Sequence, residues 1–210
     1  MTDTDAGSDR ALGFILVERH ARGRFVRLGP VLDTILSAHG YPPVIEKLLI
    51  EALTITALLG AMLKDAGGQL TMQAQTEAGP VSLLVCDYRG GEIRGYVKHD
   101  ADLLAEAGAD PTLFALFGKG YLAITFDQEA SGERYQGIVP LEGESLAQAV
   151  ESYFSQSEQI PSLVRVGIRG RVAGGLLVQH LAEGEDGRDR LHTRLDHPEW
   201  EHVAILSASI

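Results

Sequence analysis

The sequence predicts an α+β fold: an antiparallel, hairpin-rich twisted sheet packed with helices, followed by a partial helical linker. In residues 69–76, apolar Leu70, Met72 and Ala74 alternate with polar neighbours, as in a half-buried strand. Glycine-containing turns join this segment to two further strands, which is typical of an antiparallel meander. Helical patterns separate the hairpins without a regular β-α-β alternation, and this favours α+β over a parallel α/β sheet.

Composition excludes several classes of protein. The 210 residues suit one large or two small domains, and 45% hydrophobic content is too high for a disordered chain. No stretch approaches the ~18 apolar residues of a membrane span, and the acidic N-terminus is unlike a secretory signal. A net charge of −11 opposes general binding to nucleic acid or anionic membranes. We therefore expect a soluble, cytoplasmic protein without membrane or nucleic-acid partners.

Two short strands and two helices are expected before the meander. Residues 12–17 are apolar and indicate a strand, the arginine-rich residues 19–24 indicate a turn, and residues 25–28 begin a second extended piece. Pro30 suits the first turn of a short helix. Residues 44–64 carry apolar side chains almost all round a helix, so we expect this helix to be buried centrally.

The meander and the second half of the chain contain further hairpins and helices. Asp110 and Pro111 suit the N-cap and first position of a short helix that ends at Phe117. A helix from residue 144 to about 157 is followed by a strand over residues 163–172, and Gly174-Gly175 should precede the last strand. The predicted strands are residues 69–76, 81–87, 93–99, 121–126, 135–140, 163–172 and 176–181, and a closing helix begins at His197-Pro198.

The residues that could carry chemistry favour structural interpretations. His192, Asp196, His197 and His202 lie close together, but their spacing fits no zinc motif, and solvated linker residues are the preferred interpretation. Cys86 lies in an apolar strand without a basic neighbour, which indicates a buried, inert thiol. The sequence contains no Gly-x-Ser-x-Gly elbow of a serine hydrolase. No catalytic site is predicted.

Anion sites are also weakly supported. Gly118-Lys119-Gly120 follows a predicted helix and lacks the spacing of a phosphate loop, so it is interpreted as a turn. A dense basic stretch could contact an anion or RNA, but without interleaved aromatic residues a solvated turn paired with surplus acids is preferred. This stretch contains Arg19, His20, Arg22, Arg24 and Arg27, and the arginines at 165, 169 and 171 pose the same question.

Several motifs together resemble one family. The most specific is Y-F-S-Q-S-E-Q-I-P at residues 153–161, and Y-Q-G-I-V-P-L-E-G at residues 135–143 and G-G-L-L-V-Q at 174–179 follow in order. Further matches are residues 22–24, 48–52, 79–85, 94–96 and 118–125. From about Phe14 to Leu181 the chain resembles the heat-shock protein 33 family of bacterial redox-regulated chaperones. The resemblance implies an ATP-independent holdase that binds unfolded or partially unfolded client proteins under oxidative and heat stress, a homodimer, and no enzymatic activity.

One feature of that family has no counterpart in this sequence. The resemblance implies a C-terminal module whose C-x-C and C-x-x-C cysteines hold zinc when reduced, and whose oxidation forms disulfides and unfolds the module with its linker. This chain has a single cysteine, Cys86, which matches none of the four. We therefore expect no cofactor in this chain, and zinc only in the full-length family protein. Residues 10–181 are interpreted as the core chaperone domain and residues 182–210 as the start of the helical linker.

A stripe on the closing helix is the candidate client-binding surface. Trp200, Val203, Leu206 and Ile210 share helical spacing and would present apolar surface to unfolded chains. Ordinary packing against the core sheet is the preferred alternative for the same residues. Two other functions stay open: a small-molecule enzyme with a pocket at the Gly-rich turns, and an RNA-binding module that uses Arg19 to Arg27.

Overall fold

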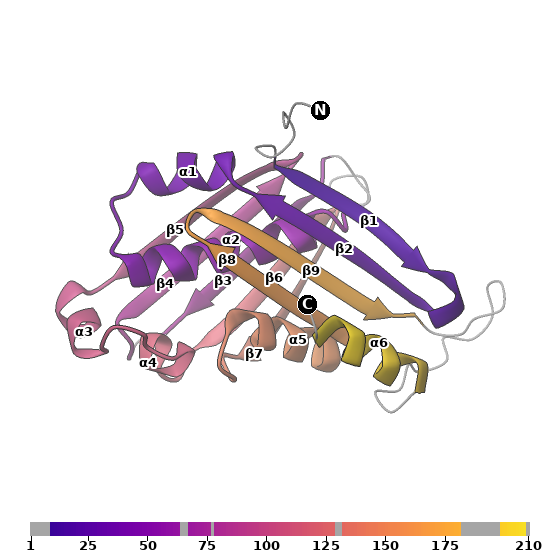
Figure 1. Ribbon diagram of the computed structural model, residues 1–210. Coiled ribbons are helices and arrows are strands. Elements are labelled where there is room, and N and C mark those ends of the chain that lie inside the picture. The colour runs from indigo at the N-terminus through magenta and orange to yellow at the C-terminus, as the bar shows by residue number, and fades with distance from the viewer. Residues whose placement is uncertain (1–8, 64–66, 77, 129–131, 182–197, 209–210) are drawn as a thin grey trace.

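Two antiparallel sheets enclose a central helix (Figure 1). The computed structural model describes residues 9–63, 67–76, 78–128, 132–181 and 198–208. One sheet has the order β1-β2-β9-β8 and the other the order β5-β4-β3-β6-β7, with every pairing antiparallel. The strands are β1 (Arg10–Leu16), β2 (Ala21–Leu28), β3 (Gln69–Gln75), β4 (Val81–Arg89), β5 (Glu92–His99), β6 (Tyr121–Gln128), β7 (Glu133–Pro140), β8 (Ser162–Arg169) and β9 (Val172–His180).

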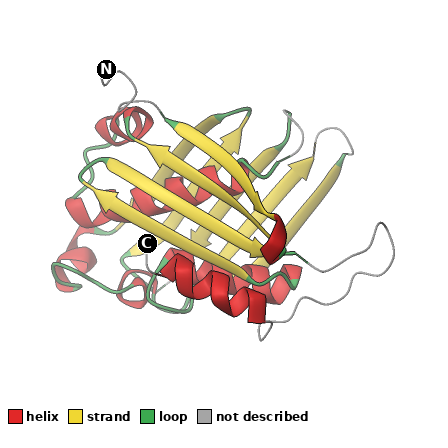
Figure 2. Ribbon diagram, turned by 45° about the vertical axis from the view of Figure 1, so that its right-hand side comes forward, coloured by secondary structure: helices red, strands yellow, loops and turns green. Residues whose placement is uncertain are grey.

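Helix α2 (Pro43–Gly60) lies between the two sheets and is buried on both sides. It packs against β3, β4 and β5 on one side and against β2, β8 and β9 on the other, and Figure 2 shows it between the two layers of strands. Glycine permits the close approach on each side: a Cβ at Gly95 would lie 3.0 Å from Leu53 Cδ2, and one at Gly175 only 2.9 Å from Leu58 Cδ1. This position explains why the apolar residues of α2 surround the helix.

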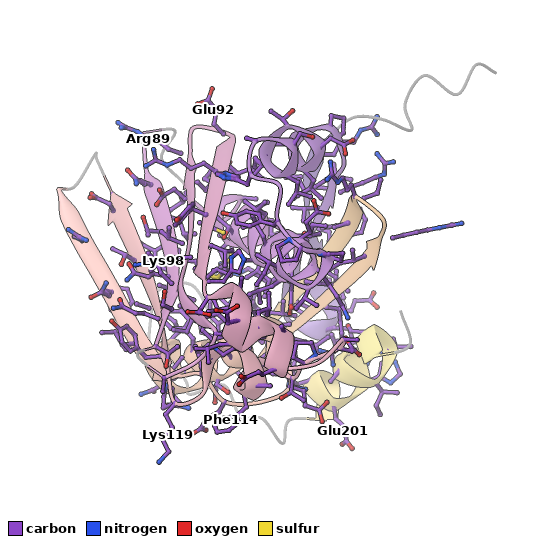
Figure 3. All side chains as sticks on the ribbon, turned by 90° about the vertical axis from the view of Figure 1, so that its left-hand side faces the viewer. Arg89, Glu92, Lys98, Phe114, Lys119 and Glu201 are labelled. Atoms are coloured by element: carbon purple, nitrogen blue, oxygen red, sulfur yellow. The ribbon has the colours of Figure 1, made fainter. Side chains whose placement is uncertain are left out.

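The remaining helices close the edges of this sandwich. Helix α5 bridges the sheets beside α2, because it packs against β7 in one sheet and β8 in the other. Figure 3 shows the two sheets nearly edge-on, with the side chains of the core between them. The other helical elements are α1 (Pro30–Ser37), α3 (Ala101–Glu106), α4 (Leu113–Phe117), α5 (Leu146–Tyr153), α6 (Pro198–Ala208), a 3₁₀ turn at Val17–Arg19 and a π-helical turn at Phe154–Glu158.

The predicted α+β class is confirmed, although the strands form two sheets instead of one. Leu70, Met72 and Ala74 are buried as the alternation of β3 predicts, and the meander β3-β4-β5 is present. The hairpin β6-β7 extends the meander sheet by pairing with β3. Residues 182–197 and 209–210 lie outside the described residues, so the division into core and linker stays a prediction.

Three local predictions were wrong. Residues 21–24 belong to strand β2 instead of a turn, because they pair with β1 on one side and β9 on the other. Strand β9 begins at Val172 and includes Gly174-Gly175, whose missing side chain at Gly175 admits α2. The N-cap of α4 is Thr112, whose hydroxyl accepts from the Ala115 N–H at 3.1 Å, while Asp110 pairs with Lys47 at 3.1 Å.

The Glu51 side chain of α2 forms a hydrogen bond with the backbone of α5. Its Oε1 accepts a hydrogen bond from the Ala147 N–H at 3.1 Å, at the first turn of α5. Burial raises the pKa of Glu51, and hydrogen bonds from the backbone of Ala147 and Leu146 oppose the rise. The native state therefore holds this proton more tightly than the unfolded chain, so stability is lost as pH rises from the usual carboxyl range through the raised pKa.

We predict that Glu51→Gln gains stability relative to the wild type as pH rises. Glutamine keeps the accepting oxygen but removes the buried charge, and each unit by which a pKa is raised is worth about 1.4 kcal/mol. Thermal unfolding from pH 4 to 8 should show a melting-temperature difference that grows in favour of the variant. Glu106→Gln, at an exposed position of α3, is the matched control and should show no such trend. A difference independent of pH would contradict this account of Glu51.

Candidate functional site: an apolar sheet face beneath α6

Apolar side chains gather on the face of the four-stranded sheet that points away from α2, where the register also places Arg27 and Arg165. The strand register places Leu12, Phe25 and Leu176 in one row across β1, β2 and β9, and Phe14 and Val178 in the next. The alternate residues, such as Val26 and Leu177, are buried in the main core with α2. Because successive side chains of a strand point to opposite faces, the first set forms the outer face.

Helix α6 covers one end of this outer face. Trp200 and Val203 are 5% and 3% exposed, and they pack with Ala21, Leu163 and Val178 in a cluster separate from the main core. The Trp200 ring centroid lies 5.8 Å from that of His180. Figure 3 shows Glu201 of the same helix pointing away from the protein body. Helix α6 thus covers apolar sheet surface with Trp200 and Val203, while Ile205 and Leu206 of the same helix stay exposed.

The outer face continues beyond the cover as exposed apolar surface. Leu12 is 59% and Phe25 41% exposed, and they face each other in the register of β1 and β2. Leu16, at the end of β1, lies on the same face as Leu12 and is 39% exposed. Strand β1 is also the edge of this sheet among the described strands, since it pairs only with β2 in the order β1-β2-β9-β8. Contiguous apolar surface of this kind is a common mark of protein–protein interaction.

The structure separates the four residues predicted to bind clients. Trp200 and Val203 point into the sheet, with Ser207 as the third buried residue of that helix face, whereas Leu206 is 57% exposed. Ile210 lies outside the described residues. The burial of Trp200 and Val203 matches the packing alternative. Client binding by any of the four stays a prediction, because nothing in the structure tests it.

The sequence pattern did not predict the apolar outer face of β1 and β2. Leu12, Phe14 and Leu16 alternate along a predicted strand, but the arginine-rich residues that follow obscured the partner strand β2. The register places Phe14 opposite Gly23, which the sequence pattern does not show. A Cβ at Gly23 would lie 2.1 Å from the Phe14 ring, so the missing side chain leaves room for the ring on the sheet.

The arginines and the metal-ligand candidates named from the sequence lie in different parts of the structure. Arg165 pairs with Glu151 at 2.8 Å, and Arg171 with Glu46 at 2.6 Å, as expected for arginines that offset surplus acids. His192, Asp196 and His197 lie outside the described residues. In the part of the chain that the structure describes, no group of three or more His, Cys, Asp or Glu side chains is placed to hold a metal.

Cys86 is fully buried in β4, beneath α2. Burial raises the pKa of the Cys86 thiol well above its usual range, and a hydrogen bond with Thr56 offsets this only in part. Because the thiolate is the reactive form, the native thiol should be inert.

We predict that a disulfide reagent modifies Cys86 in guanidinium at least roughly a hundredfold faster than in buffer, where reaction must wait for local opening. Absorbance at 412 nm with Ellman's reagent measures both rates, and Cys86→Ala is the blank. Rapid stoichiometric reaction of the native protein would contradict this assignment.

Comparison with known proteins identifies the family. A family model described as Hsp33 protein matches residues 9–209. The chain belongs to the Hsp33 family. The 33 kDa chaperonin of Caulobacter vibrioides is 38% identical over 216 residues, which cover 97% of this chain and 69% of that protein. The 33 kDa chaperonin of Yersinia pestis is 38% identical over 206 residues, with 96% and 66% covered.

The fold is that of a solved Hsp33 structure. The crystal structure of the 33 kDa chaperonin from Thermotoga maritima matches with a TM-score of 0.68 and 25% identity, over 81% of this chain and 60% of that one. The chain thus spans roughly two thirds of the length of these relatives. The structural match confirms the predicted α+β fold, and the names of the relatives support a chaperone function. In the described residues, no helix is both long and apolar enough to cross a membrane.

The most specific Hsp33-like motif, residues 153–161, folds between the two sheets. It forms the end of α5 and the π-helical turn, and Tyr153 donates a hydrogen bond to Glu158 Oε1 at 2.8 Å. Gly137 of β7 leaves space for the Tyr153 ring, because a Cβ there would lie 2.3 Å from its Cε2. π-Helical turns are rare and often occur at functional sites.

Proposed function

We propose that this chain is an ATP-independent holdase that retains unfolded or partially unfolded proteins on the outer apolar face of the four-stranded sheet. The observation that carries the proposal is the exposed row of Leu12 and Phe25, continuous with the surface beneath Trp200. Unfolding proteins expose apolar segments, and burial of these against the face would be favourable by about 25 cal/mol per Å². The names of the Hsp33 relatives support a chaperone.

Helix α6 limits how much of that surface is available. Its contacts with the sheet belong to a small cluster separate from the main core, so detachment of α6 need not disturb the remainder of the fold. We propose that α6 is a removable cover and that its release enlarges the client-binding face. Stress response in the cytoplasm as a homodimer, without enzymatic activity, is part of the same proposal.

Zinc and disulfide switching are proposed only for longer members of the family. The single cysteine of this chain is buried, and the described residues provide no ligand set, so they do not fit a zinc site. Oxidation of Cys86 is therefore not expected to control the activity of this chain. We propose that this chain holds clients equally in reductant and in peroxide.

Light scattering of heat-unfolding malate dehydrogenase, without ATP, tests this function. The chain should suppress aggregation at near-stoichiometric amounts both in dithiothreitol and in hydrogen peroxide. Phe25→Ser, which removes an exposed aromatic side chain from the face, should weaken suppression severalfold. Tyr96→Ser, at a similarly exposed position of the other sheet, is the matched control. An absence of suppression in both conditions would overturn the proposal, and suppression only in peroxide would overturn its redox-independence.

A further inference from the structure

A cavity of about 450 Å³ lies between the two sheets, beyond the C-terminal end of α2. It is bounded by Met62 and Leu63 after α2, by Phe126 of β6, by Phe154 and Ile160 of the Hsp33 motif, and by Arg22 of β2. The volume is within the range of small-molecule sites, which combine apolar walls with a few fixed polar groups. The chaperone surface described above is on the opposite face of β2, so this cavity is a separate site.

Among the described residues that line this cavity, Arg22 is the cation. Its Nε donates to Gln179 Oε1 at 3.1 Å, and Gln179 in turn donates to Ser162 Oγ at 3.1 Å, which fixes the guanidinium on the sheet. Burial and the nearby Arg24 lower the pKa of Arg22. Arg24 itself donates to the backbone oxygens of Ala61 and Gly23. Among the described residues, neither arginine pairs with a carboxylate, although acidic residues outnumber basic ones 29 to 18 in this chain.

The carboxylate among the described lining residues, Glu158, is already hydrogen-bonded. Glu158 accepts the Tyr153 hydroxyl at 2.8 Å, and the Tyr135 hydroxyl also hydrogen-bonds within this group. Two hydroxyl groups thus stabilise the Glu158 carboxylate, whereas the terminal nitrogens of Arg22 have no anionic partner in the described structure. An arginine fork presents two parallel N–H donors that match the geometry of a carboxylate.

We propose that this cavity binds a small apolar monocarboxylate. The carboxylate would accept from the terminal nitrogens of Arg22, and the apolar body would pack against Met62, Phe126 and Phe154. Two sources share this chemistry: a free organic acid, and the C-terminal residue of a peptide. The inference does not depend on the holdase proposal, because it concerns a different site and a different assay.

Calorimetric titration with octanoate and with N-acetyl-leucine tests the site. We expect at least one to bind, octanoate representing a free acid and N-acetyl-leucine a peptide terminus, and 1-octanol and octylamine to bind at least tenfold more weakly. Arg22→Met keeps an apolar stem but loses the fork, and should weaken binding roughly tenfold or more, as expected for a charge-assisted hydrogen bond. Arg94→Met, at an exposed arginine paired with Asp87, is the matched control and should bind as the wild type.

Two further variants keep the test decisive if Arg22→Met fails to fold. Met62→Trp should fill the cavity and abolish binding, and Glu158→Gln should leave carboxylate binding intact or strengthen it, whereas a cationic ligand would be lost. Circular dichroism confirms the fold of each variant. The proposal is overturned if neither carboxylate binds at millimolar concentration, if 1-octanol binds as tightly, or if a folded Arg22→Met or Met62→Trp variant retains wild-type affinity.

Discussion

Replacement of Trp200 by alanine is expected to release α6 from the sheet and to increase client binding. Trp200 is the largest side chain of the cluster formed with Ala21, Leu163, Val178 and Val203. Truncation of a buried tryptophan costs about 3–5 kcal/mol. A single helix that is held by so small a cluster should detach from the sheet when it loses this much stabilisation. We expect bis-ANS fluorescence to rise severalfold and the aggregation of malate dehydrogenase to be suppressed at a lower chaperone ratio.

The main core should survive this substitution, because its cluster does not include Trp200. Global unfolding in urea should therefore keep its midpoint within about 0.5 M while the dye-binding surface increases. Ile205→Ala, at an exposed position of the same helix, is the control and should change neither measurement. If Trp200→Ala binds no more dye and no more client than Ile205→Ala, α6 is not a cover over a functional face.

Truncation on either side of α2 is expected to destabilise the fold to a similar extent. Leu53 points toward Gly95 in the five-stranded sheet, and Leu58 toward Gly175 in the four-stranded sheet, and both are fully buried. Leu53→Ala and Leu58→Ala should each lower the free energy of unfolding by about 3 kcal/mol, within the usual range for buried leucine. Urea unfolding followed by circular dichroism measures both values.

Comparing the two leucine variants with each other and with a surface variant distinguishes a central helix from a surface helix. Lys47→Ala, at an exposed position near the start of α2, should change stability by no more than about 0.5 kcal/mol. A surface helix has one apolar stripe, so only one of the two leucines would be costly. A loss below about 1 kcal/mol at either leucine would contradict the arrangement of α2 between two sheets.

The elements with a clear period were predicted well from the sequence. The alternation in residues 69–76 and the all-round apolar pattern of residues 44–64 reflect burial on one face and on all faces, respectively, and both are local signals. The two-sheet arrangement was not predictable in this way, because strand order depends on contacts between distant segments. Strand β2 shows the difficulty: Arg22 and Arg24 mark a turn by composition, yet pairing with β1 and β9 overrides that preference.

The candidate site was predicted only in part. Helical spacing correctly placed Trp200 and Val203 on one face, but the face continues through Ser207, and Leu206 is exposed. Spacing alone cannot tell whether Leu206 or Ser207 is the buried residue after Val203, since residues three and four apart both lie on the same side of a helix. The apolar row of Leu12 and Phe25 depends on the register between β1 and β2, which the sequence pattern does not provide.

Site-specific photo-cross-linking to a client tests the central claim most directly. A benzophenone side chain replaces Phe25 on the outer face of the four-stranded sheet, or Tyr96 on the other sheet, where exposure is similar. The chain is then irradiated with heat-unfolding malate dehydrogenase. The account predicts strong cross-links to the client from position 25 and few from position 96. Equal yields from the two positions, or a higher yield from position 96, would contradict client binding on this face.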